Sequence, residues 1–408
     1  GARGDGKSYD TAAVRAAAEA IAQAGAGTLF FPPGVYLTGA FNVSSNTQVE
    51  IVVGATVLGS THGSDWPLVV GAQVWPQMGK GNCCVHPSEY CRLMHQALLF
   101  AWNAVNVTVT GGGTLDCNSK PWTWWGVRNN SQPPCNGYCK PKCFDFTNVS
   151  GAEVSHLHVR NAPEWTMHFS ICSNLWVHHV NVTNPYEGPN TDGIDIDSSQ
   201  HVLVEDSHFS SGDDALCVKS GIDYWGRRYG HPARNVTFRN IQIGTGHGIS
   251  VGSEMSGGVE DVLFDNITMK GTDTGIRMKS VRGRGGVVRG VVYRNIHMLE
   301  IKGECIQLTL NYVPAAPTNS TATPTFEDLL LENVYCRKAR NSFHLDGLPE
   351  SHLRNVTFRN VTMDAEVGRE DACSNIECRC ESSHSCPSCC RPSGMVWGHE
   401  TRDREVLV

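Results

Sequence analysis

The second half of the sequence repeats one short motif, in which a run of β-branched and aromatic residues ends at an asparagine. The clearest copies read NVTFRNI at 235–241, DVLFDNI at 261–267, VVYRNI at 291–296, LLLENV at 329–334 and NVTFRNV at 355–361. Their equivalent asparagines, 26, 29, 38 and 27 residues apart, are Asn240, Asn266, Asn295, Asn333 and Asn360. Weaker copies lie at 175–182 and 202–209. A recurrence at this spacing indicates a repeat architecture.

Each repeat holds short strands and no helical pattern, and the insertions between copies vary in length. These features favour an all-β chain folded as a parallel β-helix, in which each repeat forms one coil and buries its inner face against its neighbours. The recurring asparagines are then expected to form an internal ladder at turns. An all-β sandwich is the structural alternative, but it does not explain the repeated motif.

Outside the repeats the sequence changes character. Asp10 to Ala24 is Ala-rich and is predicted to be a helix that caps one end of the stack. Segments 65–91 and 117–143 are rich in Trp, Cys, Pro and Gly, which predicts surface loops linked by disulfides. The motif is absent near the C-terminus, so we expect a β-helix domain at 1–365 and a Cys-rich extension at 366–408.

Composition limits the partners of the chain. The formal net charge is −7 and no basic run is present, which argues against a nucleic-acid partner. No apolar run approaches 18 residues, so no membrane partner is expected, and we expect a monomer.

Seventeen cysteines are unusual in a reducing cytosol, whereas an oxidising compartment lets them pair. Ten Asn-x-Ser/Thr sequons also fit a secreted glycoprotein, at Asn42, Asn106, Asn129, Asn148, Asn181, Asn235, Asn266, Asn319, Asn355 and Asn360.

The cysteines fall into two further groups. The C-terminal group matches no paired zinc-ligand spacing, so disulfides are favoured over a metal for Cys373, Cys378, Cys380, Cys386, Cys389 and Cys390. A second group falls within the repeats, where interior thiols are expected: Cys172, Cys217, Cys305 and Cys336.

Three tryptophans in the second loop, Trp122, Trp124 and Trp125, have two interpretations. Their faces could stack on sugar rings, or they could cover an apolar end of the core, since large aromatic side chains are mostly buried. Both interpretations stay open at the level of sequence.

The stretch 190–214, NTDGIDIDSSQHVLVEDSHFSSGDD, carries carboxylates that we expect to lie together. Coils stack about 4.8 Å apart, so residues one repeat apart lie above each other on one face. Asp213 and Asp214 follow Asp192 by 21 and 22 residues, about one short coil. Successive strand residues face opposite sides, so the adjacent pair shares a site only where the backbone bends, and Gly212 favours such a bend.

Further polar residues follow at similar intervals: His247, Arg277, Lys279 and Tyr312. Arg277 and Lys279 are two apart and therefore face the same side, which suits the binding of a substrate carboxylate. Two or three carboxylates held together are what glycoside hydrolysis needs, because one protonates the leaving oxygen while another activates water or attacks the sugar. A general acid must be protonated at the working pH, so we expect an acidic optimum.

Acidic residues in turns are often merely solvated, or they bind calcium. For Asp195 and Asp197 we favour those roles or internal hydrogen bonding. Solvation does not predict a coil-by-coil recurrence, so it explains the set around Asp192, Asp213 and Asp214 less well.

At these residues the sequence resembles the polygalacturonase family of pectin-degrading glycoside hydrolases. The motifs that carry the resemblance are Asn190-Thr-Asp192, Gly212-Asp-Asp214, Gly246-His-Gly248 and Arg277-Met-Lys279, the last with Met where the family usually has Ile. The resemblance runs from the opening GARGDG and PPGVYLTG through about residue 365, which makes 1–365 the catalytic domain. It implies a right-handed parallel β-helix and hydrolysis of α-1,4 bonds between galacturonic acid units with inversion at the anomeric carbon.

The resemblance also implies roles. Asp213 becomes the general acid, Asp192 and Asp214 hold and deprotonate the water, and His247 supports protonation of the acid. Substrate carboxylates fall to Arg277 and Lys279, with Asn190 and Tyr312 as further contacts. No metal and no cofactor is expected, and the substrate is polygalacturonate or a pectic oligosaccharide of the cell wall.

Two segments, SGIDYWGRRYG at 220–230 and GSEMSGGV at 252–259, resemble the branch of the family that includes exo-acting members, so exo action is expected. The alternatives are a hydrolase of xylogalacturonan or rhamnogalacturonan, a calcium-dependent pectate lyase, and a non-catalytic sugar-binding β-helix such as an adhesin. Paired Asp213 and Asp214 with His247 favour hydrolysis over the lyase reaction.

Overall fold

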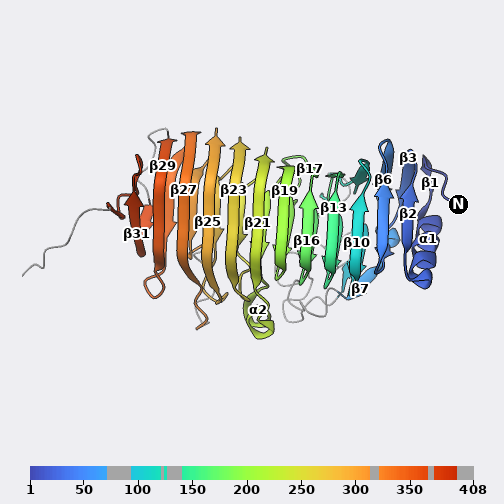
Figure 1. Cartoon of the computed structure of the whole chain (residues 1–408), viewed down its shortest axis with the longest axis horizontal. Helices are drawn as coiled ribbons and strands as arrows, with labels where there is room; N and C mark the ends of the chain where they lie inside the picture. The colour runs from blue at the N-terminus through green and yellow to red at the C-terminus, as the bar shows by residue number, and fades with distance from the viewer. Residues whose placement is uncertain (71–92, 121–123, 126–139, 313–320, 366–371, 393–408) are drawn as a thin grey trace, which may run out of the picture.

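The protein is an elongated stack of β-coils with a helix at its N-terminal end (Figure 1). The structure is a computed structural model that describes residues 1–70, 93–120, 124–125, 140–312, 321–365 and 372–392. The predicted parallel β-helix is confirmed, because the strands of successive coils pair in parallel along the whole described stack. Within those ranges no helix has the length and apolar character needed to cross a membrane.

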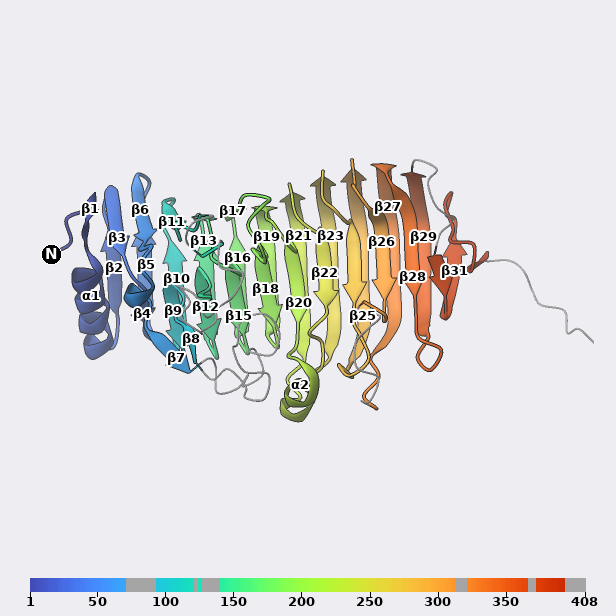
Figure 2. The same ribbon diagram turned by 180° about the vertical axis from the view of Figure 1, so that it is seen from behind.

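One face of the stack is a parallel sheet, here called sheet B, to which each coil contributes one short strand (Figure 2). Its strands pair in register, so that side chains of successive coils stand in straight columns. Eleven described strands form it in the order β4 (Phe41–Val43), β9 (Leu99–Trp102), β12 (Phe144–Thr147), β15 (Met167–Ser170), β18 (Ile194–Asp197), β20 (Leu216–Lys219), β22 (Ile249–Gly252), β24 (Ile276–Lys279), β26 (Glu304–Thr309), β28 (Asn341–Asp346) and β30 (Ala372–Ser374).

The other faces form a second and longer sheet, sheet A. Its early coils contribute short strands: β1 (Asp5–Tyr9), β2 (Gly27–Phe31), β3 (Gly34–Thr38), β5 (Thr47–Ile51), β6 (Ala55–Gly59), β10 (Val105–Thr110), β11 (Thr114–Asp116), β13 (Ser150–Ser155), β14 (His158–Arg160), β16 (Ser173–His178) and β17 (Asn181–Thr183). Later coils contribute long ones: β19 (Gln200–Ser210), β21 (Ala233–Ile243), β23 (Val259–Lys270), β25 (Val287–Leu299), β27 (Thr325–Ala339) and β29 (Leu353–Ala365), followed by β31 (Ile376–Glu381) and β32 (Arg391–Pro392). A small antiparallel pair, β7 (Leu68–Val70) and β8 (Leu93–His95), lies outside both sheets.

The repeated asparagines bend the long strands of sheet A. All five are in the left-handed conformation, which Asn tolerates better than most residues. Their amides form a ladder, with Asn266 donating to Asn240 at 2.9 Å and Asn360 to Asn333 at 2.8 Å. The predicted internal position is wrong, because these side chains are exposed or half-buried on the outer surface. The left-handed bend turns them outward, where neighbouring amides replace water as partners.

A second ladder, of alternating charge, runs beside the asparagines. The residue before each asparagine pairs with its counterpart in an adjacent coil, as Arg239 does with Glu205 at 2.6 Å and Arg359 with Glu332 at 2.9 Å. The column reads Glu205, Arg239, Asp265, Arg294, Glu332, Arg359 and Glu381. Opposite charges that lie directly across from each other on paired strands favour the observed register over one in which a strand is shifted along its neighbour.

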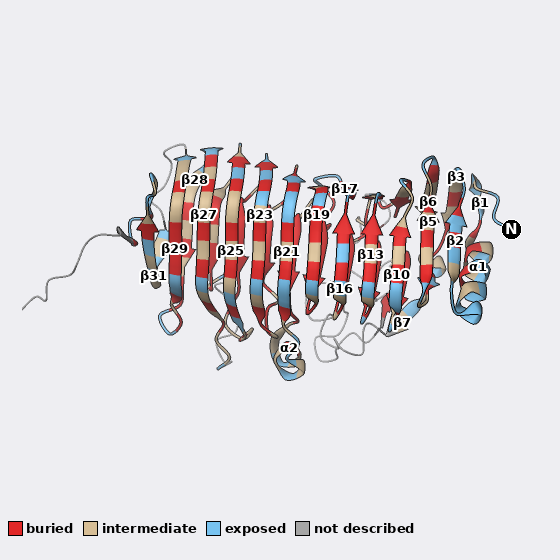
Figure 3. Ribbon diagram, viewed as in Figure 1, coloured by how far each residue is buried: buried red, intermediate tan, exposed pale blue. Residues whose placement is uncertain are grey.

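The core lies inside the coils, where apolar side chains of both sheets meet. Burial alternates along the strands of sheet A, as expected for one face inward and one outward (Figure 3). Phe238, Phe264 and Tyr293 stack face to face in three consecutive coils with ring centroids 5.0 Å apart. This spacing matches the distance between coils, so identical ring positions repeat without gaps.

The N-terminal end of the stack is covered by α1 (Thr11–Ala24), as predicted. Val14 and Ala18 bury against the first coils, and Arg15 donates to the carbonyls of Ala40 and Asp65 at 2.8 and 2.9 Å. The helix ends at Gly25 in the left-handed conformation, which Gly adopts without a steric penalty.

Disulfides pair most of the described cysteines. The C-terminal group forms three, Cys373–Cys389, Cys378–Cys390 and Cys380–Cys386, which confirms disulfides over a metal there. Cys117–Cys143 closes the second Trp-rich loop. Cys172 and Cys217 are buried free thiols, as predicted, but Cys305 and Cys336 form a disulfide, so the prediction of free thiols is wrong for that pair. Cys305 and Cys336 lie on adjacent coils, which brings their sulfur atoms within bonding distance.

The stack continues past the point where the sequence motif ends. β30 pairs with β28 and β31 pairs with β29, so residues 372–381 add strands to both sheets. The division at residue 365 therefore marks the end of the motif and not of the β-helix, and its functional meaning stays a prediction.

The tryptophans of the second loop cover the core where they are described. Trp124 is fully buried and packs edge-on against Trp66 and His95. Trp125 donates its indole N–H to the carbonyl of Ala162 at 2.8 Å. Of the two interpretations the structure favours core packing, and Trp122 lies outside the described residues.

The ring stack of the core predicts a large effect of a single truncation. Phe264→Ala removes the middle ring and should lower the free energy of unfolding by about 3–5 kcal/mol, because the neighbouring rings cannot collapse into the space. The matched control is Leu263→Ala on the same strand, whose side chain faces outward and is half-buried. Urea unfolding followed by circular dichroism measures both, and an equal loss in the two variants would contradict the packing described here.

Candidate active site

The predicted carboxylates and His247 come from one turn, the turn that precedes the sheet B strand, in consecutive coils. Backbone hydrogen bonds join these turns: the N–H of Gly193 donates to the carbonyl of Asp214 and the N–H of His247 to the carbonyl of Asp213, both at 2.8 Å. The registers of β18 on β20 and of β20 on β22, extended by two residues, align Asp192 with Asp214 and Asp214 with His247. The expected coil-by-coil stacking of these residues is therefore present.

Two glycines allow the turns to approach one another. The backbone bends at Gly212 and Asp213, as expected, and a side chain at Gly212 would also meet the carbonyl oxygens of Gly188 and Tyr186, so a close contact requires this glycine as well. At Gly246 the φ angle is +120° and a Cβ would meet the carbonyl oxygen of Asp213 at 2.5 Å. The Gly-rich turns thus bring the Asp213 backbone against the turn that carries His247.

Asp214 lies at the centre of a buried group of charges. Its Oδ2 is 2.7 Å from Nζ of Lys279, and its Oδ1 is 3.3 Å from the guanidinium of Arg277 and accepts from Ser250 at 2.6 Å. Arg277 also donates to the hydroxyl of Tyr312 at 3.0 Å, and both cations lie over the Tyr312 ring. Arg277 and Lys279 face the same side of β24, as predicted from their spacing.

The cations determine the protonation of Asp214. Burial raises the pKa of this carboxyl, but Lys279 and Arg277 outweigh burial and hold its pKa well below the ordinary value. Burial in turn lowers the pKa of Lys279, and Asp214 more than compensates, so the pKa of that ammonium is raised. These shifts favour Asp214 as an anion and Lys279 as a cation.

Asp213 points to the more open side of the turn. Its side chain is 20% exposed, whereas that of Asp214 is 1% exposed. Nδ1 of His247 is 3.0 Å from Oδ1 of Asp213, and Asn190 donates to Oδ2 at 3.3 Å. The two adjacent aspartates therefore occupy one site but different environments, one reachable from outside and one enclosed by cations.

Asp192 lies one coil before this pair, in a second buried cluster. Nζ of Lys219 is 3.7 Å from Asp192, 3.5 Å from Asp195 and 3.3 Å from Glu254. Burial, with Asp195 and Asp213 nearby, raises the pKa of Asp192 well above its usual value. Burial likewise raises the pKa of Asp195 to about 7 although Lys219 opposes it.

The interpretation of Asp195 as a solvated residue is wrong, because its side chain is fully buried and stands in the sheet B column between His168 and Cys217. Asp197, two residues on, is held by internal hydrogen bonds, as one of the expected alternatives proposed. It accepts from Ser198 at 3.0 Å and from the N–H of Gly221 at 3.1 Å.

Three residues of the site were not predicted. Asp273 occupies the same turn one coil after His247, with Oδ2 3.5 Å from Nε2 of His247 and bonds to Tyr186 and Lys302. Lys219 and Glu254 form the ion pair beside Asp192. The register of β22 on β24 aligns His247 with Thr274, so the column alone does not identify Asp273. Lys219 lies in no motif, whereas Glu254 lies in the segment at 252–259.

Two groups in the site have the ligand types that a metal needs: Asp213, Asp214 and His247, and separately Asp192, Asp195 and Cys217. Both contain carboxylates that already contact cationic side chains, Lys279 for the first group and Lys219 for the second. The positive charge that a metal would supply is thus provided by the protein, which favours chemistry by proton transfer at this site.

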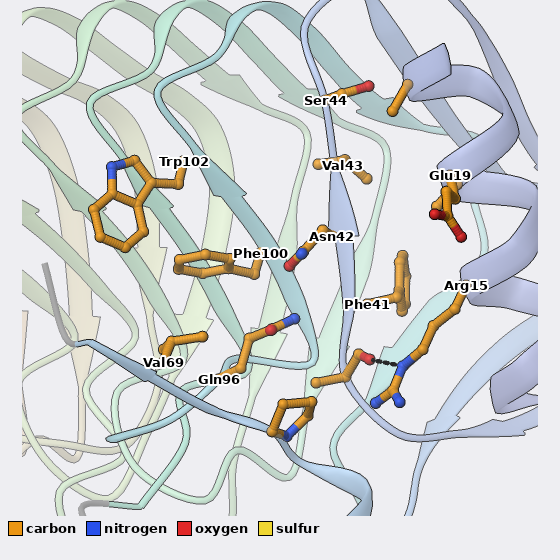
Figure 4. Close-up of a pocket in the computed structure, with 14 residues that line it drawn as sticks. Arg15, Glu19, Phe41, Asn42, Val43, Ser44, Val69, Gln96, Phe100 and Trp102 are labelled. Atoms are coloured by element: carbon orange, nitrogen blue, oxygen red, sulfur yellow. Dashed lines mark hydrogen bonds between the residues drawn. The ribbon is translucent and has the colours of Figure 1, made fainter. Parts of the chain in front are cut away.

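A cavity of about 710 Å³ lies well away from these residues, between α1 and the first strands of sheet B (Figure 4). Phe100 and Trp102 line one side, and Arg15 and Glu19 of the helix line the other. Phe100 stands three coils before β18, so the cavity belongs to the N-terminal end and contains none of the predicted site residues.

Comparison with known proteins agrees with the geometry. Residues 79–386 match the family described as glycosyl hydrolases family 28. A probable polygalacturonase of Vitis vinifera is 28% identical over 371 residues, which cover 89% of this chain and 72% of that protein. Polygalacturonase QRT2 of Arabidopsis thaliana is 30% identical over 309 residues, covering 73% of this chain and 67% of the relative.

Solved structures show the same fold. An exopolygalacturonase from Thermotoga maritima superposes with a TM-score of 0.80 at 23% identity, covering 94% of this chain and 89% of that one. A family 28 exopolygalacturonase from Yersinia enterocolitica superposes with a TM-score of 0.78 at 21% identity, covering 95% and 75%. Because the family match covers most of this chain, the chain belongs to glycosyl hydrolase family 28 and is a polygalacturonase-like glycosidase.

Proposed function

We propose that the protein hydrolyses α-1,4-galacturonosyl bonds of polygalacturonate from a chain end, with inversion at the anomeric carbon. One observation carries this proposal: a partly exposed carboxyl, Asp213, lies directly beside a buried anion, Asp214, that is paired with Arg277 and Lys279. Such an arrangement offers one group that can give a proton, a fixed negative charge, and cations beside an acidic sugar.

Asp213 is proposed as the general acid. Its exposed oxygen can reach the glycosidic oxygen of a bound sugar, and the proton it gives is replaced through water. His247 lies between Asp213 and Asp273, so it can orient the acid and hold a proton near it. Asn190, which donates to the other oxygen of Asp213, fixes the rotation of the carboxyl group.

The two remaining carboxylates are proposed to divide the work of activating water. A carboxylate with a depressed pKa is a weak base, so Asp214 is better suited to orient the water than to take its proton. Asp192, whose pKa is raised, has the higher proton affinity and is proposed to be the base. In an inverting enzyme this pair stands across the anomeric carbon from the acid and leaves room for water.

Recognition of the acidic sugar is assigned to the cations above Tyr312. Arg277 keeps guanidinium N–H groups beyond those used by Asp214 and Tyr312, since guanidinium has five donors. Tyr312 is 37% exposed and offers an aromatic face beside them. An anionic ring placed there would be attracted by the cations and stacked by the phenol.

Exo action is supported by the segment that follows β20. It contains α2 (Asp223–Tyr229), which projects from the coil that carries Asp214 (Figures 1 and 2). Arg227 donates to the carbonyls of Gly283 and Arg284, and Arg284 pairs with Asp223, so the helix is held against the turn that follows β24. Added structure there favours binding of a chain end over binding across the middle of a polymer.

The surroundings fit an oxidising compartment. The described residues contain five disulfides, and the relatives are plant and bacterial polygalacturonases, which suits an extracellular protein. Action on the pectin of the cell wall is part of the proposal.

The first prediction concerns the acid. Asp213→Asn should lower kcat by roughly 10²–10⁴-fold, because an amide cannot give a proton to the leaving oxygen. Reducing-end assays on polygalacturonate measure it, with thermal unfolding as a check on the fold. The matched control is Asp206→Asn, since Asn stands at the equivalent ladder position in the next coil and the activity should not change. A fully active Asp213→Asn protein would remove Asp213 from the proposed role.

The second prediction concerns pH. Asp195 is a cause, after burial, of the raised pKa of Asp192. Asp195→Asn removes that negative charge, so the pKa of Asp192 should fall, and the limb of the kcat/KM profile that reports Asp192 should move to lower pH. A profile with both limbs at unchanged pH would separate Asp192 from the base role.

The same substitution tests the burial of Asp195 independently of activity. Its folded pKa is about 7, above the value of 3.8 that applies when it is exposed, so the native state binds the extra proton. This contribution to stability is complete below about pH 4 and is lost as the pH rises to about 7. The stability of the wild type relative to Asp195→Asn should therefore fall across that window in urea titrations, and a constant difference would contradict the buried, protonated carboxyl.

The third prediction concerns products. Early digests of polygalacturonate should contain galacturonic acid monomer, released first as the β-anomer, which nuclear magnetic resonance detects because inversion reverses an α-bond. No ultraviolet absorbance should develop, and a chelator should not change the rate. Oligomers as first products would indicate internal cleavage. Unsaturated, calcium-dependent products would indicate a lyase, and faster cleavage of a xylose- or rhamnose-containing pectin would point to another pectic hydrolase.

A further inference from the structure

Three histidines gather on sheet A, away from the turns that form the active site. His156 follows β13, His178 ends β16 in the next coil, and His179 follows β16 directly. Each offers a ring nitrogen, and the three nitrogens lie within 4.8 Å of one another. Such proximity is the first requirement for a shared metal ion, since imidazole is a common ligand of first-row transition metals.

The histidines stand where the two surface ladders would continue. The registers of β13 on β16 and of β16 on β19 align His156 and His179 with Asp206 and then with the asparagines that follow. Both histidines have the same left-handed backbone, with φ angles of 50° and 53°. His178 aligns with Glu205 in the charged column. Two adjacent coils therefore keep the backbone of the ladder while exchanging its amides for imidazoles.

The three rings are in contact with one another. His156 and His179 stack with centroids 4.9 Å apart, and the edge of His178 faces both rings. Nδ1 of His178 is 2.9 Å from Nδ1 of His179, while Nε2 of His178 is 3.3 Å from a carboxylate oxygen of Glu153. A carboxylate on one ring nitrogen directs the lone pair of the other nitrogen toward the cluster, which is the usual outer-shell arrangement of a metal-binding histidine.

The anchoring of His178 limits the rearrangement that binding requires. Its ring is only 8% exposed and stacks on Trp176 at 3.9 Å, and Trp176 donates to Glu205 at 2.8 Å. His156 and His179 are exposed and free to adjust. A tetrahedral ion with bonds of 2.0–2.1 Å separates its ligand nitrogens by roughly 3.4 Å, which small rotations of the two exposed rings can reach.

We propose that His156, His178 and His179 bind one divalent transition-metal ion, of which Zn²⁺ is the test case, with Glu153 as the outer-shell partner of His178. Three protein ligands leave one position for water. The ion joins two adjacent coils on the outer surface, and it takes no part in the hydrolysis proposed above.

The test uses the full chain, treated with chelator and then titrated with ZnCl₂ near neutral pH by calorimetry. One ion per chain should bind to the wild type and raise its melting temperature, because a ligand that binds only the folded state stabilises it. His156→Asn and His179→Asn should each weaken binding at least tenfold. Asn is the residue that this ladder position carries in later coils, so these variants should fold normally.

His201→Asn is the matched control. His201 also has a left-handed backbone on sheet A, with a φ angle of 56°, and bonds to Asn235 outside the cluster. Its substitution should leave zinc affinity unchanged. Wild-type zinc affinity in the His156→Asn, His179→Asn double variant would overturn the proposal, because the ion would then bind elsewhere. Absence of binding to the wild type at about 100 µM Zn²⁺ would also overturn it and leave the three rings as part of a hydrogen-bonded ladder.

Discussion

In-register parallel pairing of the sheet B strands is the constraint on which the site depends. Each strand hydrogen-bonds to the equivalent residues of the next coil, so a side chain at a given position recurs about every 4.8 Å along one line. Residues 192, 214 and 247, separated by 22 and 33 positions in sequence, thereby become neighbours. A slip of one residue would turn every column to the opposite face and disperse the site.

Such close stacking creates an electrostatic problem. Two carboxylates one coil apart repel by about 3–4 kcal/mol at the effective dielectric constant typical of proteins. The columns resolve it by interleaving cations: Lys219 stands in the column of Lys279, two coils earlier, and contacts Asp192 and Asp195, while Lys279 and Arg277 neutralise Asp214. The negative charge of Asp192 is compensated less fully than that of Asp214. Burial beside other acids therefore raises the pKa of Asp192. The positions of lysine and arginine in the columns thus determine the difference in proton affinity between Asp192 and Asp214.

Sequence reasoning succeeds where a periodic pattern reports a local preference. The asparagine repeat predicts the β-helix because each copy is a strand with a bend, and column spacing predicts which polar residues meet. It fails where the prediction concerns the direction in which a side chain points or how deeply the side chain is buried. The asparagines lie outside because their left-handed backbone turns them outward, and Asp195 is buried because neighbouring columns cover it, neither of which the spacing of residues records. The bend expected at Gly212 is present, but the sequence does not reveal that the glycine is also required by the carbonyl oxygens of Gly188 and Tyr186, which belong to the preceding coil. Contacts of that kind appear only once the coils are stacked.

The same architecture separates the chemistry from the way in which a polymer is held. Only the strands must keep their register, so the segments between them can lengthen without moving the columns. The coil after β20 uses this freedom: 33 residues separate Leu216 from its partner Ile249, against 22 for the coil before, and the extra length forms α2. A helix inserted there changes the surface that follows β20 while Lys279, Arg277 and His247 keep their places. In the proposed function, residues fixed in columns cleave the bond, whereas the choice between a chain end and a chain interior is left to insertions that the columns do not control.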